Sequence, residues 1–541
     1  MSLLQITQLT TELQAGDGWI RAVDRIDLSL ASGQTLCLVG ESGSGKSVTA
    51  LSVLGLLPYG RYRHPSGRVQ FHDPRSDARL DLLHADEATL CRVRGGRISM
   101  IFQEPMTSLN PVLTIGEQLD EIVQLHRPAM SAAERYQRCV AALAEVRIPE
   151  PQDRIREYPH RLSGGQRQRV MIAMALICEP ALLIADEPTT ALDVTVQAEI
   201  LKLMRELQHR HGMGVLFITH DFGVVAQIAD HVAVMRHGQV VETGETQAVL
   251  TRPQHEYTRS LIAALPERLP QRPRPPVHGE TLVELRELSV HFPIRRGLLR
   301  RVVDYVRAVE QVSLEINAGE VVALVGESGC GKTTLGKALL RLEQATAGRI
   351  YVEGQDITRL KSAALRQMRR RIQVVFQDPG SSLNPRLPVF TTLLEPMRVH
   401  GIGRDDAERI RRAAELLQRV EMPADSLWRY PHEFSGGQRQ RLAIARALVL
   451  EPRFILCDEI TSALDVSVQA GILKLLRRLV DEQRLGLLFI THNMGVVDYL
   501  ADRMAVMFNG RIVETGSTQT VLHGPRHDYT RSLLAAVPRL G

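Results

Sequence analysis

Two stretches of the chain have the residue types and spacing of a phosphate-binding loop. An apolar run from Leu36 ends in Gly-Glu-Ser-Gly-Ser-Gly-Lys-Ser, and a second run from Leu324 ends in Gly-Glu-Ser-Gly-Cys-Gly-Lys-Thr. Glycines at these spacings let the backbone turn tightly, so that its N–H groups point at phosphate oxygens. The lysine brings a positive charge to the outer phosphates, the next hydroxyl suits Mg²⁺, and the helix that follows favours an anion at its start. The residues expected at the phosphates are Gly40, Glu41, Ser42, Gly43, Ser44, Gly45, Lys46 and Ser47, and Gly326, Glu327, Ser328, Gly329, Cys330, Gly331, Lys332, Thr333 and Thr334.

In each half of the chain, a pair of carboxylates follows another apolar run, C-terminal to the phosphate loop. Asp186-Glu187 and Asp458-Glu459 come directly after runs that are apolar on both faces, as buried parallel strands are. Ligands of open α/β sheets bind beyond the C-terminal ends of the strands, so these carboxylates should face the phosphate loops. We expect Asp186 and Asp458 to hold Mg²⁺ together with Ser47 and Thr333. Glu187 and Glu459 are expected to orient or deprotonate an attacking water.

Two further polar side chains follow strand-like runs in each half of the chain. Gln103 and Gln377 end the runs from Ile98 and Ile372, and a neutral amide there can reach the metal or the water. His220 and His492 end the next apolar runs, where an imidazole can hydrogen-bond a γ-phosphate. We therefore include all four in the predicted catalytic site, with the glutamines also as metal ligands.

Each half also contains a second glycine-rich helix start, with the sequence Ser-Gly-Gly-Gln. Because a helix start of this kind binds anions, each half has two phosphate cradles for one nucleotide. The simplest geometry docks the two halves head to tail within one chain, so that the loop of one and the Ser-Gly-Gly of the other enclose a single ATP. The residues of this motif are Ser163, Gly164, Gly165 and Gln166, and Ser435, Gly436, Gly437 and Gln438.

These motifs lie in an internal repeat. Ser163 and Ser435, and also His220 and His492, are 272 residues apart, so the register is constant. We predict two α/β domains, at 1–265 and 281–541, joined by a proline-rich extended linker at 266–280. Each domain should have a parallel, RecA-like P-loop core, an antiparallel β layer and an inserted helical subdomain.

The two copies differ in length in the part that precedes Ser163 and Ser435, where the constant spacing of the repeat begins. The first copy has about a dozen extra residues, which we place in the polar stretch 61–89, where loops tolerate insertion. Both copies predict a hairpin turn, at His237-Gly238 and Asn509-Gly510. The basic run 295–301 is expected to be a solvated loop.

Composition narrows the class of protein. The 541 residues include 44% apolar types and carry a net charge of only +5, which gives no evidence of a nucleic-acid partner. The six cysteines form no C-x-x-C pair, which suits a reducing cytoplasm, and we expect all six to be buried. The N-terminus lacks the features of a secretory signal, and no apolar run reaches the roughly 18 residues of a membrane-spanning helix.

The repeated motifs resemble those of the ATP-binding cassette (ABC) ATPases, nearly end to end in both copies. The resemblance implies that ATP and Mg²⁺ are the cofactors and that 162–166 is the signature motif. It also implies that Asp193 and Asp465 lie in D-loops and that the two histidines are switch histidines. Trp19 and Tyr305, each 21 residues before a loop glycine, resemble the aromatic residue that stacks on adenine.

Other segments are similar to the peptide and nickel importer branch of that family. These are FQEPMTSLNP from Phe102, FQDPGSSLNP from Phe376, and the tails from Pro253 and Pro525. The first half resembles the D-type and the second half the F-type ATPase of dipeptide and oligopeptide importers, fused as in Yej-type importers. The resemblance implies a peripheral ATPase on the cytoplasmic face of the bacterial inner membrane. It would work with two transmembrane permease subunits and a substrate-binding protein, and without nucleic acid.

Two alternatives remain, and the sequence departs from the family pattern in three ways. The cargo could be glutathione, nickel or a sugar instead of a peptide. A soluble tandem ABC protein acting on ribosomes or DNA fits less well, because those types carry a long charged helical linker or zinc-binding cysteines. Ile460 replaces the usual proline after the acidic pair. The sequence therefore leaves equal turnover at the two ATP sites open. Phe434 replaces the first leucine of the signature, and neither tail has the cysteine cluster of an iron–sulfur centre.

Overall fold

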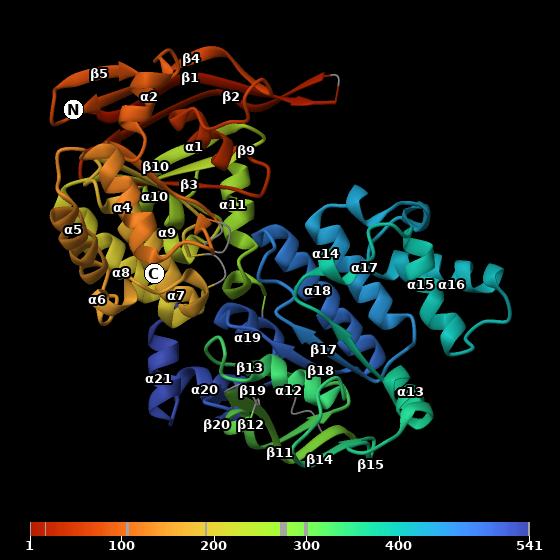
Figure 1. Cartoon of the computed structure of the whole chain (residues 1–541). Coiled ribbons are helices and arrows are strands. Elements are labelled where there is room, and N and C mark those ends of the chain that lie inside the picture. The colour runs from red at the N-terminus through yellow and green to blue at the C-terminus, as the bar shows by residue number, and fades with distance from the viewer. Residues whose placement is uncertain are drawn as a thin grey trace. The chain divides into compact units, whose positions relative to one another are not determined.

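The computed structural model describes residues 2–16, 18–103, 108–189, 192–270, 279–296 and 301–538. The chain divides into two compact units, one comprising the chain up to Ala263 together with Pro538, and the other Ala264–Val537. Each unit has a six-stranded and a four-stranded sheet (Figure 1). The repeat predicted from the sequence is therefore a repeat of structure.

The six-stranded sheet is the core of each unit. In the first unit its order is β10-β9-β3-β8-β7-β6, all parallel except for β10, which pairs antiparallel with β9. The central strands are apolar and buried along their whole length, as the runs without alternation predicted. Its strands are β3 (Thr35–Val39), β6 (Ile98–Ile101), β7 (Leu182–Asp186), β8 (Gly214–Thr219), β9 (His231–Arg236) and β10 (Gln239–Glu245).

The second unit repeats this sheet in the order β16-β17-β18-β13-β19-β20, again with only the last pair antiparallel. Its strands are β13 (Val321–Val325), β16 (Ile372–Val375), β17 (Phe454–Asp458), β18 (Gly486–Ile490), β19 (Arg503–Phe508) and β20 (Arg511–Ser517).

A four-stranded antiparallel layer accompanies each core, as predicted. In the first unit it consists of β1 (Ser2–Ala15), β2 (Gly18–Ala31), β4 (Tyr62–Asp73) and β5 (Ala78–Asp81). In the second it consists of β11 (Thr281–Arg296), β12 (Arg301–Asn317), β14 (Ala347–Val352) and β15 (Gln355–Asp356). The extra residues of the first copy lengthen β4 and β5 rather than a loop. The expectation of a loop insertion is wrong, because the added residues pair across the sheet.

Helices surround the sheets of each unit, and the helical subdomain is inserted between two core strands. In the first unit α4 (Ile115–His126), α5 (Ala132–Glu145) and α6 (Pro151–Arg154) lie between β6 and β7 in the chain. In the second unit α15 (Val389–Val399) and α16 (Asp406–Arg419) take the same place in the chain. The other helices of the first unit are α1 (Lys46–Leu54), α2 (Glu87–Val93), α7 (Gly164–Leu176), α8 (Val194–His211), α9 (Phe222–Ile228), α10 (Thr246–Thr251) and α11 (Glu256–Ala263). Those of the second are α12 (Lys332–Leu339), α13 (Ser362–Arg371), α14 (Pro379–Ser382), α17 (Gly436–Leu448), α18 (Val466–Gln483), α19 (Met494–Leu500), α20 (Thr518–His523) and α21 (Asp528–Ala535).

Local predictions have mixed outcomes. Both hairpin turns form, with positive φ at both turn residues, as a type I′ turn requires. Cys91 is exposed, so the expectation of six buried cysteines is wrong at this position, which lies on the outer face of α2. The predicted extended linker begins instead with a 3₁₀ turn at Pro266–Arg268, and most of its remainder, 271–278, lies outside the described residues. Within the described ranges, no helix has both the length and the apolar character to cross a membrane.

Candidate nucleotide-binding site

The phosphate loops connect a core strand to a helix in each unit. The first loop joins β3 to α1, and the second joins β13 to α12. Gly40 and Gly326 have φ angles of 152° and 153°. A Cβ at either position would collide with a backbone carbonyl oxygen, that of Met235 or Met507. Glycine is required there because the loop runs directly against the end of the neighbouring strand.

The loop lysines lie inside the curve of their own loops. Lys46 is buried, and its Nζ donates to the carbonyl oxygens of Gly40 and Glu41 at 2.8 and 3.0 Å. Lys332 makes the equivalent two contacts, both at 2.8 Å. Each ammonium group is therefore fixed at the mouth of a backbone cradle, where phosphate oxygens would meet it.

The hydroxyl and carboxylate expected at the metal lie next to each other in both units. Ser47 Oγ donates to Asp186 Oδ1 at 3.1 Å, and Thr333 Oγ1 donates to Asp458 Oδ1 at 3.3 Å. Both carboxylates are buried, and burial raises their pKa values above the ordinary range. A hydroxyl and a carboxylate side by side fit Mg²⁺, which takes few protein ligands and completes its shell with phosphates and water.

The acidic residue after each aspartate is held between a glutamine and a histidine. Gln103 Nε2 donates to Glu187 Oε2 at 2.9 Å, and His220 Nδ1 lies 3.0 Å from Oε1. The backbone at Glu187 is left-handed, with φ of 47°, a conformation that is strained for a residue with a side chain. These contacts bring the three residues, each predicted as part of a catalytic site, together from the ends of three neighbouring strands.

The second unit repeats this arrangement with one looser contact. Gln377 Nε2 donates to Glu459 Oε2 at 3.0 Å, whereas His492 Nδ1 lies 3.6 Å from Oε1. The His492 imidazole lowers the pKa of Glu459 below its usual value. Glu459 has the same left-handed backbone, with φ of 48°. Ile460, in place of the usual proline, is buried in the core of this unit.

Both Ser-Gly-Gly-Gln motifs begin a helix. Ser163 precedes α7, and its hydroxyl accepts from the backbone N–H of Gln166 at 3.3 Å. Ser435 does the same before α17. A Cβ at Gly165 would lie 2.6 Å from Val196 Cγ1, whereas one at Gly164 would meet nothing within 4 Å. The second glycine is thus required for packing against α8, and the first leaves the helix start open.

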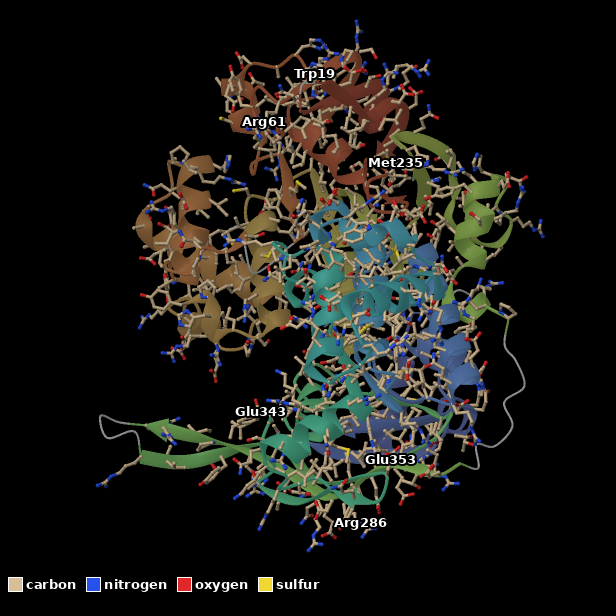
Figure 2. All side chains as sticks on the ribbon, turned by 90° about the vertical axis from the view of Figure 1, so that its right-hand side faces the viewer. Trp19, Arg61, Met235, Arg286, Glu343 and Glu353 are labelled. Atoms are coloured by element: carbon tan, nitrogen blue, oxygen red, sulfur yellow. The ribbon has the colours of Figure 1, made fainter. Side chains whose placement is uncertain are left out.

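The remaining predicted residues lie on elements around these sites. Trp19 on β2 is 41% exposed (Figure 2). The Arg63 guanidinium carbon lies 4.5 Å from the Trp19 ring centroid. Tyr305 on β12 is 52% exposed. Asp193 and Asp465 precede α8 and α18, and Asp193 accepts the backbone N–H of Val196 at 3.2 Å. Exposed rings can accept a stacking partner, and adenine stacking there remains a prediction.

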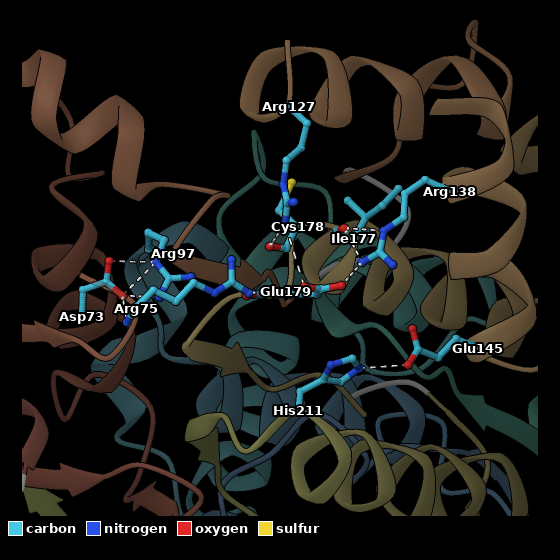
Figure 3. A network of polar contacts seen from close by, with 10 residues as sticks. All are labelled: Asp73, Arg75, Arg97, Arg127, Arg138, Glu145, Ile177, Cys178, Glu179 and His211. Atoms are coloured by element: carbon cyan, nitrogen blue, oxygen red, sulfur yellow. Dashed lines mark hydrogen bonds and ion pairs between the residues drawn. The ribbon is translucent and has the colours of Figure 1, made fainter. Parts of the chain in front are cut away.

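Sequence reasoning missed two features, one at the phosphate loops and one at the N-terminal side of β7. Tail tyrosines contact the second residue of each phosphate loop, and the sequence signal for them is the His-x-Tyr-Thr-Arg-Ser-Leu motif that the two tails share. The other is a carboxylate in the first unit, Glu179, which pairs with arginines from three different segments (Figure 3). These are Arg75, Arg127 and Arg138. No local sequence pattern predicts these ion pairs, because the paired residues are far apart in the chain.

Comparison with known proteins agrees with this geometry. A family model described as "ABC transporter" matches residues 23–190 and 309–462, and one described as "Oligopeptide/dipeptide transporter, C-terminal region" matches 241–289 and 513–541. The chain is 51% identical to the peptidoglycan transport ATP-binding protein YejF of Agrobacterium fabrum, over 99% of this chain and 96% of the relative. It is 48% identical to the glutathione import ATP-binding protein GsiA of Escherichia coli, over 99% of this chain and 90% of the relative. With two matching cassettes in one polypeptide, the chain belongs to the ABC transporter family, as an ATP-binding transport ATPase.

Proposed function

We propose that this protein hydrolyses ATP at two sites to drive the import of peptides through a membrane permease. The observation that carries the proposal is the pairing, in each unit, of a phosphate loop with a glutamate held between Gln and His. The cargo rests on a different observation, the match of both tails to the oligopeptide and dipeptide transporter C-terminal region.

The residues of each site have distinct roles in this proposal. The loop N–H groups and Lys46 or Lys332 bind the phosphates, and the aspartate, loop hydroxyl and glutamine would hold Mg²⁺. When bound, the metal neutralises charge on the phosphate oxygens. Glu187 and Glu459 orient the attacking water and accept its proton, while the histidines position those carboxylates and reach the γ-phosphate.

We further propose that each ATP is shared by the two units. The loop of each unit would not need the helix start at Ser163 or Ser435 of that same unit, since one phosphate group needs one such cradle. Head-to-tail docking would bring it to the nucleotide held by the other loop. ATP binding would then close the units, because bound nucleotide and Mg²⁺ neutralise charges that face each other.

The proposed partners are two transmembrane permease subunits and an extracytoplasmic substrate-binding protein, with this chain peripheral on the cytoplasmic face of the membrane. The 48% identity to a glutathione import ATPase favours glutathione, itself a small peptide, as the second candidate cargo. Cargo is selected by the permease and binding protein, so similarity of the ATPase alone leaves both candidates in place.

The test is reconstitution of the chain with its permeases and binding protein in proteoliposomes. ATP hydrolysis is measured with a panel of di- to hexapeptides, with glutathione and with a sugar. We expect stimulation by peptides and ATP-dependent uptake of the same ligands. Stimulation by glutathione alone would make glutathione the cargo in place of other peptides. Stimulation by a sugar alone would contradict peptide import in any form.

A further inference from the structure

A tyrosine of the C-terminal tail reaches the phosphate loop in both units. In the first, Tyr257 Oη donates to Glu41 Oε2 at 3.1 Å. In the second, the backbone N–H of Glu327 donates to Tyr529 Oη at 3.0 Å. Glu41 and Glu327 directly follow the first glycine of their loops, and the tyrosines occupy the same place in the repeat. The same tail position therefore contacts the same loop position twice in one chain.

The tail helices that carry these tyrosines are anchored in the same way. Glu242 on β10 accepts the backbone N–H groups of the two residues before α11, at 2.7 and 3.1 Å. Glu514 on β20 accepts those of the two residues before α21, at 2.8 and 3.0 Å. Each tail helix therefore starts at a fixed point on the terminal hairpin of the core sheet.

Each tyrosine ring also contacts a residue at the end of the first strand of that hairpin, β9 or β19. The Arg236 guanidinium carbon, at the end of β9, lies 4.7 Å from the centroid of the Tyr257 ring. Phe508, at the end of β19, stacks on Tyr529 with the ring centroids 4.2 Å apart. Burial raises the pKa of Tyr257, so its hydroxyl stays protonated and able to donate.

The phosphate loop has a second attachment to the same hairpin. The backbone N–H of Gly238, in the β9–β10 turn, donates to the carbonyl oxygen of Ser44 at 3.0 Å. Gly510 makes the same contact with Cys330 at 3.0 Å. The hairpin turn thus holds the middle of each loop and the tail tyrosine holds its beginning, so the tail is part of what fixes the loop backbone.

We propose that Tyr257 and Tyr529 are positioning residues for the nucleotide: each fixes the start of its phosphate loop, so that ATP affinity depends on a docked C-terminal tail. This inference rests on the proposed ATPase function and extends it, because it assigns the tail a role at the ATP site. A ligand or partner that displaced the tail would weaken ATP binding without touching a residue that contacts the nucleotide.

The test uses Tyr257→Phe, Tyr529→Phe and the double variant in the full chain, because phenylalanine keeps the ring contacts and removes only the hydroxyl. Tyr351→Phe is the matched control. Its ring lies under Arg286 at 4.6 Å and its hydroxyl accepts from Arg349 at 3.4 Å, on strand β14 away from the loop. Loss of one net hydrogen bond should raise the Kd of a non-hydrolysable ATP analogue about fivefold at the affected site.

In the double variant we expect KM for ATP to rise about fivefold, kcat to stay within twofold, and the unfolding temperature without nucleotide to match that of the control. Unchanged ATP affinity in the double variant would overturn the inference. Weaker ATP binding that came with an equal loss of thermal stability would also overturn it, since the hydroxyls would then only support the fold. A wild-type chain that bound no ATP would instead refute the proposed function itself.

Discussion

Replacing Glu187 with glutamine tests the catalytic assignment most sharply at one site. The carboxylate is held at 2.9 Å by Gln103 and at 3.0 Å by His220, so an isosteric amide keeps the position of the side chain. The amide carries no charge and accepts no proton from water. Removing a general base slows catalysis by about 10²–10⁴-fold, which corresponds to roughly 3–5 kcal/mol in the activation barrier. ATP binding should persist, because the loop and its lysine are unchanged.

Because the chain has two sites, the informative variant is the double one, Glu187→Gln with Glu459→Gln. If the sites act independently, Glu187→Gln alone leaves about half of the turnover, and the double variant loses at least 100-fold. Phosphate release measures turnover, and equilibrium binding measures ATP affinity. Glu451→Gln is the control, since Glu451 has a similar left-handed backbone, with φ of 52°, and an exposed carboxylate. Turnover of the double variant within tenfold of wild type would refute the assignment.

Three other predictions concern the loop and the stability of each unit. Asp73→Ala should destabilise the first unit by about 3 kcal/mol in chemical unfolding, because it leaves the largely buried Arg97 without its counter-charge. The control is Asp425→Ala, which removes one partner of an exposed ion pair and should change the free energy of unfolding by less than about 1 kcal/mol. Gly40→Ala should abolish ATP binding, because the added Cβ would overlap a backbone carbonyl oxygen. Gly43→Ala should only weaken ATP binding, because a Cβ there would meet nothing within 4 Å. Comparable ATP binding by the two variants would contradict this. Hydrogen bonds from neighbouring arginines lower the pKa of Asp406 to about 2 from 3.8. The stabilisation from this depressed pKa is present above about pH 4 and is lost as the pH falls towards 2, so Asp406→Asn should flatten the unfolding temperature over that range.

The elements that position the sites could be predicted because their signals are local. A phosphate loop needs its glycines within a few residues of one another, and Asp186 ends an apolar run that fits a buried parallel strand better than a half-exposed one. The Asn509-Gly510 turn has a strong dipeptide signal. His237-Gly238 has a weaker one, yet it adopts the same left-handed backbone, because the flanking strands require it.

The features that sequence reasoning missed depend on contacts between distant residues. Tyr257 and Glu41 are 216 positions apart, and the repeated tail motif marks the tyrosine without indicating its partner. The extra residues of the first copy are polar, which favours a loop, but backbone pairing between β4 and β5 does not require apolar side chains. Arg75, on the turn between those strands, then reaches Glu179, a contact that no pattern near either residue predicts.

The central claim, that each nucleotide is shared between the units, is tested by counting tightly bound ATP in the Glu187→Gln/Glu459→Gln chain. Two ATP per chain are expected, and Lys46→Ala should leave one. Adding Ser435→Arg damages the same composite site and should still leave one, whereas adding Ser163→Arg damages the other site and should leave none. The opposite pattern, with one ATP retained beside Ser163→Arg and none beside Ser435→Arg, would show that each unit binds its nucleotide alone.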